Sequence, residues 1–266
     1  MVEYEDDAVN NFRCSTFLAI LVVGLSDAAW GATVFYSGVD LGATAGGPFP
    51  NSAASATSWQ TAAADLGSIS SVDFETTPLG FFLNLAPLQL GVPGISIEPS
   101  GSADGDDSEI VSVDTPLRGF NTTPAGSRYV HLIETGVGEP DIGVIFSFAT
   151  PLSAFGIWVS GVGTAGGITT FEFNNGVSQL ITLPGSASGG AQFVGFTDDS
   201  NLISSVTIRV SPLEGTNSDE IGLDDVSFVT IPEPSTAALS LLGIGVLALV
   251  RRRRLHYAAA TRYFGS

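Results

Sequence analysis

The chain has 266 residues, a formal net charge of −18 and one cysteine. Residues 33–231 contain 21 acidic residues against three basic ones, Arg118, Arg128 and Arg209. So acidic a segment repels phosphate backbones, which argues against nucleic acid as a partner. Because the single cysteine is Cys14, near the N-terminus, the rest of the chain has neither a disulfide nor a thiol nucleophile.

The N-terminus has the pattern of an export signal. Residues 16–25 form an uninterrupted apolar stretch after Arg13, with the length of a signal-peptide core rather than of a membrane span. Small residues allow cleavage before Ala32, so residues 1–31 are predicted to be a signal peptide. The acidic residues at the start do not fit the basic beginning of such a signal. Initiation near Val9 would remove them and leave a short, net-positive leader.

Residues 32–230 are predicted to form one extracytoplasmic β-domain. Short apolar and β-branched runs recur there, bounded by Gly, Pro, Asn, Asp or Ser, as in strands joined by turns. No stretch between residues 33 and 228 has a convincing amphipathic helix; the best is 58–66. The expected strands are 33–36, 72–74, 95–97, 110–113, 129–133, 144–148, 154–159, 169–173, 179–182, 193–196, 206–210 and 223–229. This pattern predicts an all-β fold, a jelly-roll-like β-sandwich, flanked by an N-terminal signal helix and a C-terminal single transmembrane helix.

Four phrases in this domain resemble those of secreted jelly-roll domains, which are similar to carbohydrate-binding modules and extracellular adhesion sandwiches. The phrases are residues 72–75, 120–129, 144–156 and 222–228. The resemblance implies the fold better than the ligand, because activities diverge widely on this architecture.

The same resemblance implies a structural calcium ion as a cofactor. In similar sandwiches an acid at the end of an early strand meets one near the end of the last strand, and the matching residues here are Glu75 and Asp224 or Asp225. Calcium takes about six to eight oxygens, so backbone carbonyls and water would complete the shell. Solvated carboxylates at strand ends are the alternative.

Residues suited to catalysis are few. His256 lies near the C-terminus and His131 is isolated. The histidines are therefore too few and too far apart to suggest a Ser-His-Asp triad or a histidine-rich zinc site. No pair of carboxylates stands out as a glycosidase pair. We therefore expect a non-catalytic domain that binds a glycan or another surface partner, with Trp59, Tyr129 or Trp158 as stacking platforms if exposed. A purely structural matrix protein without a specific ligand is the alternative, and a secreted hydrolase is less favoured.

The C-terminal region has three features in a fixed order. The motif Pro232, Glu233, Pro234 is followed by an uncharged run, 235–250, and then by Arg251, Arg252, Arg253 and Arg254. The run is short for a span of about 20 residues, but arginines can snorkel and some mismatch is tolerated. By the positive-inside rule the arginines determine the topology and stay cytoplasmic. The prolines keep their segment extended and open to a protease or transpeptidase.

These features resemble the PEP-CTERM sorting signal of Gram-negative bacteria over residues 231–254, with a transmembrane helix at 235–250. The resemblance implies an exosortase-type membrane enzyme as a partner and the inner membrane as the place of processing. The precursor would be membrane-anchored and the mature protein located at the cell surface or outside the cell, with extracellular polysaccharide as a further expected partner. Such proteins usually end soon after the arginines, whereas residues 255–266 add a predicted cytoplasmic tail. A plain C-terminal anchor is the alternative.

Overall fold

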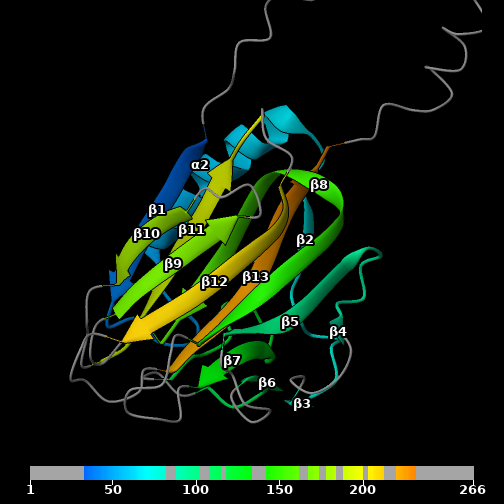
Figure 1. Cartoon of the computed structure of the whole chain (residues 1–266). Coiled ribbons are helices and arrows are strands. Elements are labelled where there is room, and N and C mark those ends of the chain that lie inside the picture. Colours follow the sequence, from blue (N-terminus) through cyan, green and yellow to red (C-terminus); the bar gives the residue numbers. More distant parts are fainter. Residues whose placement is uncertain are drawn as a thin grey trace, which may run out of the picture.

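The computed structural model describes residues 33–81, 88–101, 108–114, 118–133, 142–161, 167–173, 178–183, 188–199, 203–212 and 220–231. These ranges form strands and one helix, so the prediction of a mostly β fold is confirmed (Figure 1). The helix is α2 (Pro50–Leu66). The strands are β1 (Val34–Leu41), β2 (Ser70–Val72), β3 (Gly80–Phe81), β4 (Leu88–Gln89), β5 (Ile95–Gly101), β6 (Ser108–Val111), β7 (Tyr129–Ile133), β8 (Ile142–Ser160), β9 (Gly167–Phe173), β10 (Ser178–Leu183), β11 (Gly190–Thr197), β12 (Ile203–Pro212) and β13 (Glu220–Thr230).

Strand β8 is long enough to belong to two layers of one β-sandwich-like sheet. Its first half pairs with β12 and β5, and its second half pairs with β11 and β13. One layer therefore contains β10, β9, β12, the first half of β8, β5 and β4. The other contains β1, β11, the second half of β8, β13, β7, β6 and β3, with β2 also paired to β13. The register along β8 thus explains how one continuous sheet folds over itself (Figure 1).

The sequence predicted two strands, 144–148 and 154–159, where the structure has the single strand β8. Pro151 lies between them and suggested a break, because proline cannot donate a ladder hydrogen bond. In the structure Pro151 lies where β8 changes partners, and its carbonyl accepts a hydrogen bond from Ile231 N at 2.7 Å. No strand pairing there requires a backbone N–H from Pro151, so the strand continues through the proline.

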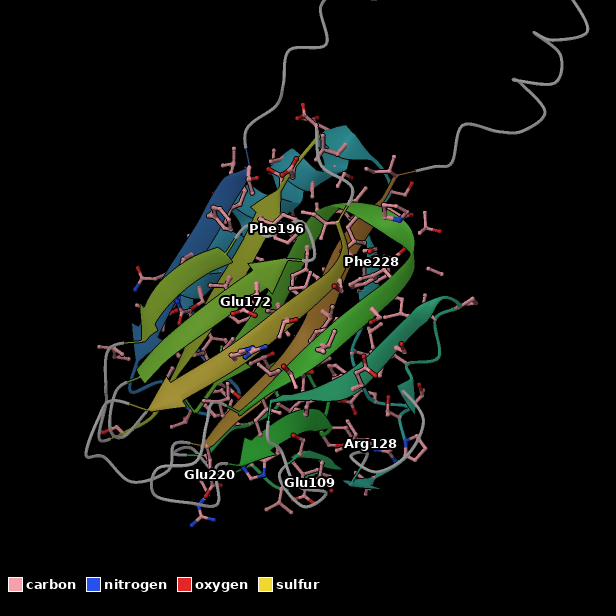
Figure 2. The ribbon with its side chains drawn as sticks, in the orientation of Figure 1. Glu109, Arg128, Glu172, Phe196, Glu220 and Phe228 are labelled. Carbon is pink, nitrogen blue, oxygen red and sulfur yellow. The ribbon has the colours of Figure 1, made fainter. Side chains whose placement is uncertain are left out.

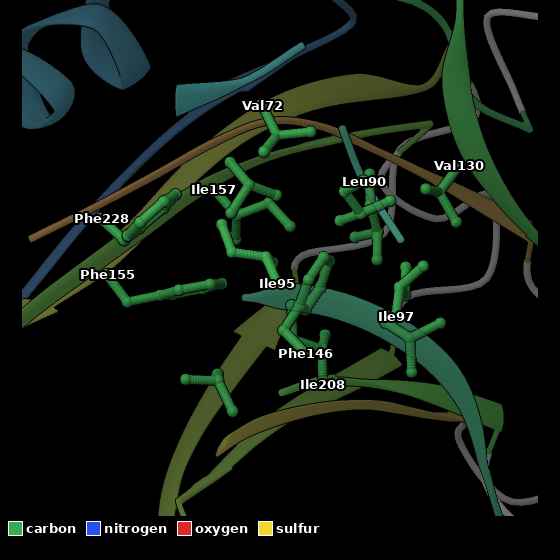
Figure 3. Close-up of a cluster of buried hydrophobic side chains, with 14 of the residues drawn as sticks. Val72, Leu90, Ile95, Ile97, Val130, Phe146, Phe155, Ile157, Ile208 and Phe228 are labelled. Carbon is green, nitrogen blue, oxygen red and sulfur yellow. The ribbon is translucent and has the colours of Figure 1, made fainter. Parts of the chain in front are cut away.

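The core lies between the two layers. Phe146 and Ile208 from one layer meet Phe155 and Ile157 from the other (Figure 3). The rings of Phe146 and Phe155 have centroids 5.8 Å apart in a tilted arrangement. Burial of each such side chain stabilises the fold by about 1.5–3 kcal/mol before the entropic cost is counted. The packing therefore needs no disulfide to hold the layers together.

A helix as long as α2 was not expected in the domain, although the weak candidate at 58–66 lies within it. It packs against β1 and β11 (Figure 1). Its buried positions are Ser52, Ala56, Trp59 and Ala63, which follow a helical spacing but are small or polar apart from the tryptophan. A stripe of this kind carries a weak hydrophobic signal, because periodicity is detected through large apolar residues.

Trp59 anchors α2 on the sheet. Its side chain is fully buried and its Nε1 donates to the carbonyl of Phe196 at 2.9 Å. The indole lies over Gly195 and Gly156, which are paired across β11 and β8. A Cβ at Gly195 would lie 2.9 Å from Trp59 Cδ1. The two glycines therefore leave the space that lets the indole reach the sheet backbone.

Candidate functional site

The candidate site is built around the loop 121–128, which precedes β7. Glu75, just after β2, and the acidic pair of β13, Asp224 and Asp225, both hydrogen-bond to this loop. The structure thus brings together all three residues that the sequence singled out for calcium. We call Asp73, Glu75, Asp224 and Asp225 the acidic cluster.

A β-bulge in β13 positions the acidic pair. Asp224 is paired with Trp158 of β8, but the next pair in the register is Ser227 with Gly156, so β13 has one residue more than β8 there. Asp225 has a φ of 47°, in the left-handed region that aspartate tolerates better than most residues. Asp224 is fully buried and Asp225 is half-buried. The bulge therefore interrupts the alternation of side chains between the two faces of β13, and the carboxylates of Asp224 and Asp225 both lie next to the loop.

Asp224 binds the start of the loop through one oxygen. Its Oδ2 accepts hydrogen bonds from Thr122 N at 2.7 Å, Thr122 Oγ1 at 3.0 Å and Thr123 N at 3.1 Å. Asp225 Oδ1 accepts a further hydrogen bond from Thr123 Oγ1 at 2.6 Å. Hydrogen bonds to a carboxylate are stronger than neutral ones. The acidic pair therefore fixes Thr122 and Thr123.

Glu75 binds the end of the loop in the same manner. Its Oε1 accepts from Asn121 Nδ2 at 2.8 Å, Ser127 N at 2.8 Å and Arg128 N at 2.9 Å. Residue Phe74, immediately before it, has a φ of 59°, which directs the chain into a turn closed by a hydrogen bond from Thr77 N to Phe74 O. The loop is therefore held at both ends by carboxylates.

Two buried oxygens in this site accept no hydrogen bond from the described residues: Asp224 Oδ1 and Asn121 Oδ1. Burial raises the pKa of Asp224 to about 7, and the charge of Asp225 adds to this rise. Burial also raises the pKa of Asp225, assisted by Asp73 and Glu75 and opposed by the threonine hydroxyls. Within the described ranges, no three His, Cys, Asp or Glu side chains gather in a metal-binding geometry. The prediction of calcium there stays a prediction.

A pocket of about 550 Å³ lies beside the acidic cluster. Its wall contains the half-buried rings of Phe49 and Trp158, whose centroids are 5.7 Å apart. The polar part of the wall includes Asp114, Asn121 and Asp225. The remaining lining residues are Ala45, Gly46, Gly47, Pro48, Thr122, Thr123, Pro124, Ala125 and Gly126. Apolar rings beside a few polar groups are the usual composition of a small-ligand pocket.

The loop that borders the pocket has a strained turn. Gly126 N donates to Thr123 O at 2.9 Å, and Ala125 has a φ of 63°. Pro124 followed by a residue with positive φ has the form of a type II turn. Phe74, Ala125 and Asp225 are the non-glycine residues with positive φ in the described part of the chain. All three lie at this site, and such strain concentrates where a protein positions functional groups.

The structure separates the three aromatic residues that were considered as stacking platforms. Trp59 is fully buried under α2, and Tyr129 is 1% exposed. Trp158 is half-buried and lines the pocket. Phe49, which sequence reasoning did not consider, completes the wall and stacks on Phe120 with a centroid distance of 6.0 Å. It precedes α2 directly, so a correct helix start would have drawn attention to it.

His131 lies at a second, smaller pocket of about 360 Å³. Its Nε2 lies 2.9 Å from Glu220 Oε2, and its Nδ1 lies 3.8 Å from Glu109 Oε1. Both glutamates lie at the same end of the molecule (Figure 2). Arg118 Nη1 lies 3.5 Å from Glu220 Oε1 and lines the same pocket. These contacts link β6, β7 and β13 around His131.

The predicted signal peptide, 1–31, and the C-terminal features lie outside the described residues. The latter are Pro232, Glu233, Pro234, the run 235–250, Arg251, Arg252, Arg253, Arg254 and the tail 255–266. Among the residues that the structure does describe, no helix is both long and apolar enough to cross a bilayer. The membrane span at 235–250 therefore stays a prediction.

The fold and the site define a β-sandwich-like domain with an acidic, aromatic-lined pocket. Residues 230–254 match the PEP-CTERM protein-sorting motif. The chain therefore carries a PEP-CTERM sorting motif, which implies an exported protein processed by an exosortase. This confirms the identification made from the order of prolines, apolar run and arginines.

Several solved structures show partial similarity to this chain. The K2 cleaved adhesin domain of Lys-gingipain is 14% identical, with a TM-score of 0.42 over 62% of this chain and 99% of that chain. The family 11 carbohydrate-binding module of cellulosomal cellulase Lic26A-Cel5E of Clostridium thermocellum is 14% identical, with a TM-score of 0.31 over 59% and 98%. The xylan-binding module CBM15 is 15% identical, with a TM-score of 0.31 over 56% and 97%. No curated protein sequence is significantly similar to the chain.

Proposed function

We propose that this protein is a non-catalytic glycan-binding protein of the cell surface or extracellular matrix, and that the pocket beside Trp158 is its binding site. The observation that carries the proposal is the composition of the pocket wall. Two aromatic rings face a space bounded by carboxylate, amide and hydroxyl groups. A sugar ring has apolar C–H faces and a rim of hydroxyl groups, so it can stack on an indole while its hydroxyls donate to carboxylates.

The loop 121–128 suits this role because the acidic cluster fixes it before any ligand arrives. Its hydrogen bonds to Glu75, Asp224 and Asp225 involve both ends of the loop. A binding surface that is already ordered loses less conformational entropy when it binds a ligand. The strain at Ala125 and Asp225 is then a cost of holding this surface in place.

A glycan array probed with the full-length protein tests the proposal. We expect reproducible binding to at least one glycan class, and a loss of at least about tenfold in affinity for Trp158→Ala, equivalent to about 1.4 kcal/mol. Thr57→Ala is the matched control, since Thr57 is exposed on α2, away from the pocket lining. No binding by the wild-type protein would favour the alternative, a structural matrix protein that adds charge and bulk without a specific ligand. A secreted hydrolase would instead release products from polysaccharide substrates.

The rest of the proposal is a signal peptide at 1–31, a jelly-roll domain at 32–230, a membrane helix at 235–250 and a cytoplasmic tail at 255–266; the sorting motif at 230–254 supports its export and processing. In this scheme Arg251, Arg252, Arg253 and Arg254 set the topology, and an exosortase acts at Pro232, Glu233 and Pro234 at the inner membrane. Intact-mass analysis of the surface form is the test. A C-terminus at or near Pro234 is expected, whereas a retained tail through Ser266 would indicate a plain anchor.

We also propose that a calcium ion neutralises part of the acidic cluster through Glu75, Asp224 and Asp225. The support is Asp224 Oδ1, a buried oxygen that accepts no hydrogen bond from the described residues. Calcium binds such carboxylate oxygens together with carbonyls and water. Millimolar calcium should then raise the melting temperature of the full-length protein above its value in chelator, and Asp224→Asn should abolish the difference. Equal melting temperatures in calcium and chelator would refute a bound ion.

A further inference from the structure

The charges of the pocket define a class of ligand more closely than its shape does. We infer that the glycan bound at Trp158 carries a protonated amino group, as in a polymer of glucosamine, and that Asp114 and Asp225 select it. This inference rests on the proposed glycan-binding function and concerns the same pocket.

Among the residues that the structure describes, no basic side chain lines this pocket. Only three arginines occur between residues 33 and 231, with no lysine, and all three lie in the described part of the chain. Arg118 lines the second pocket beside Glu220, and Arg209 Nε lies 3.3 Å from Glu172 Oε2. Arg128 Nη1 donates to the carbonyl of Thr77 at 2.6 Å. A uronic acid, sulfate or phosphate group would therefore meet carboxylates without a compensating basic side chain.

Two carboxylates form part of the pocket wall itself. Asp114 is exposed, and its Oδ1 accepts a hydrogen bond from Asn121 N at 2.9 Å. Asp225 accepts from the hydroxyls of Thr123 and Thr122 at 2.6 and 3.3 Å. Neither carboxylate forms an ion pair with an arginine among the described residues. Both can therefore accept a charge-assisted hydrogen bond from an ammonium group.

The site stays negative even if the calcium ion proposed above is bound. Five carboxylates lie in the acidic cluster and at Asp114, and one divalent ion balances two of them. An ammonium group beside the Trp158 ring also gains a cation–π attraction that a neutral sugar lacks. Charge and aromatic surface thus favour the same ligand class.

A binding series with four pentasaccharides tests this inference. The full-length protein is titrated calorimetrically with β-1,4-linked pentamers of glucosamine, N-acetylglucosamine and glucose, and with a galacturonic acid pentamer. The buffer is held near pH 6.5, where the ligand amine is substantially protonated. We expect the glucosamine pentamer to bind at least about tenfold more tightly than the two neutral pentamers. The galacturonic acid pentamer should bind most weakly, and the preference for glucosamine should fall as the salt concentration rises.

Charge-neutral variants identify the residues responsible. Asp114→Asn and Asp225→Asn retain a side-chain oxygen for their internal hydrogen bonds, and each should reduce the preference for glucosamine over glucose by about threefold or more. Asp65→Asn, an exposed change on α2, is the matched control and should leave the preference unchanged. Melting temperatures of all variants show that they remain folded.

The outcomes distinguish this inference from the function on which it rests. Equal affinity for glucosamine and glucose, or an unchanged preference in both aspartate variants, would overturn the amino-sugar inference and leave glycan binding intact. Tightest binding of the galacturonic acid pentamer would do the same. No binding of any of these pentamers, together with a silent glycan array, would overturn glycan binding itself.

Discussion

The hydrogen bonds between Asp40 and the start of α2 allow a quantitative prediction about how the pocket is held. Asp40, on β1, accepts from Asn51 N at 3.0 Å and from Ser52 N at 2.8 Å. Phe49, the N-cap residue of α2, makes no side-chain capping hydrogen bond. Asp40 therefore caps the helix from a neighbouring strand. Loss of a cap costs about 0.5–2 kcal/mol, and loss of a negative charge at a helix N-terminus about 0.3–1 kcal/mol. We expect Asp40→Ala to reduce the free energy of unfolding by about 2 kcal/mol.

The pH dependence of this effect follows from the direction of the pKa shift. Burial would raise the pKa of Asp40, but hydrogen bonds from Ser52 and Asn51 outweigh it and lower the pKa below its usual 3.8. For a lowered pKa, the stabilisation is present above the unfolded-state pKa and is lost as the pH falls through the folded-state pKa. The difference between wild type and Asp40→Ala should therefore be full at neutral pH and shrink below about pH 4.

Urea unfolding of the full-length protein across this pH range measures the difference. The matched control is Asp65→Ala, near the other end of α2, where removal of a negative charge is neutral or slightly favourable. Equal stability of wild type and Asp40→Ala at neutral pH would refute the capping role, as would a difference that stays constant down to pH 2.5. Because Phe49 precedes the capped turn, Asp40→Ala should also weaken glycan binding at the pocket.

Two further changes test the packing beneath the site. Gly195→Ala should destabilise the protein by about 1–3 kcal/mol, because the new methyl group would lie 2.8 Å from the Phe155 carbonyl oxygen and 2.9 Å from the Trp59 indole; an unchanged urea midpoint would show that both the backbone and the indole can move. Tyr129→Phe should cost about 1–2 kcal/mol, because its hydroxyl shares one proton between the carbonyls of Val113 and Gly119, which lie at 2.8 and 3.0 Å. A midpoint equal to that of the wild type would mean that water replaces the hydroxyl.

Much of the strand content could be predicted from the sequence, because alternation is a local property. Val206 and Ile208 of β12, for example, are both buried in the core, as the period of two in a strand predicts. The sequence around Pro151 could not show that β8 continues through the proline. That continuity depends on the point at which β8 changes from one set of partner strands to another. The full helix α2 could not be predicted, because its buried positions Ser52, Ala56 and Ala63 carry little hydrophobic signal. Its one large buried residue, Trp59, fits the sheet only because Gly156 and Gly195 leave room for the indole, and this is a tertiary property.

The candidate site, like the fold, could be predicted only in part. The sequence and the family resemblance singled out Glu75, Asp224 and Asp225, and these residues are neighbours in the structure. The phrase 120–129 was recognised as part of the family resemblance, but its hydrogen bonds to Asp224 were not predicted, because two of the donors are backbone N–H groups, which are independent of residue type. The bulge at Asp225 was equally invisible, since no glycine marks its positive φ. Phe49 enters the pocket only once the start of α2 is known.

The tryptophan indole resonances provide the most direct test of the pocket as the binding site. In a titration followed by ¹⁵N NMR, the indole N–H of Trp158 should shift with the bound fraction of glycan. Trp59 is an internal control, because its indole is fully buried and already bonded to the Phe196 carbonyl. We expect a saturable shift of the Trp158 resonance with little change in that of Trp59. A glycan that binds without moving the Trp158 resonance would contradict it.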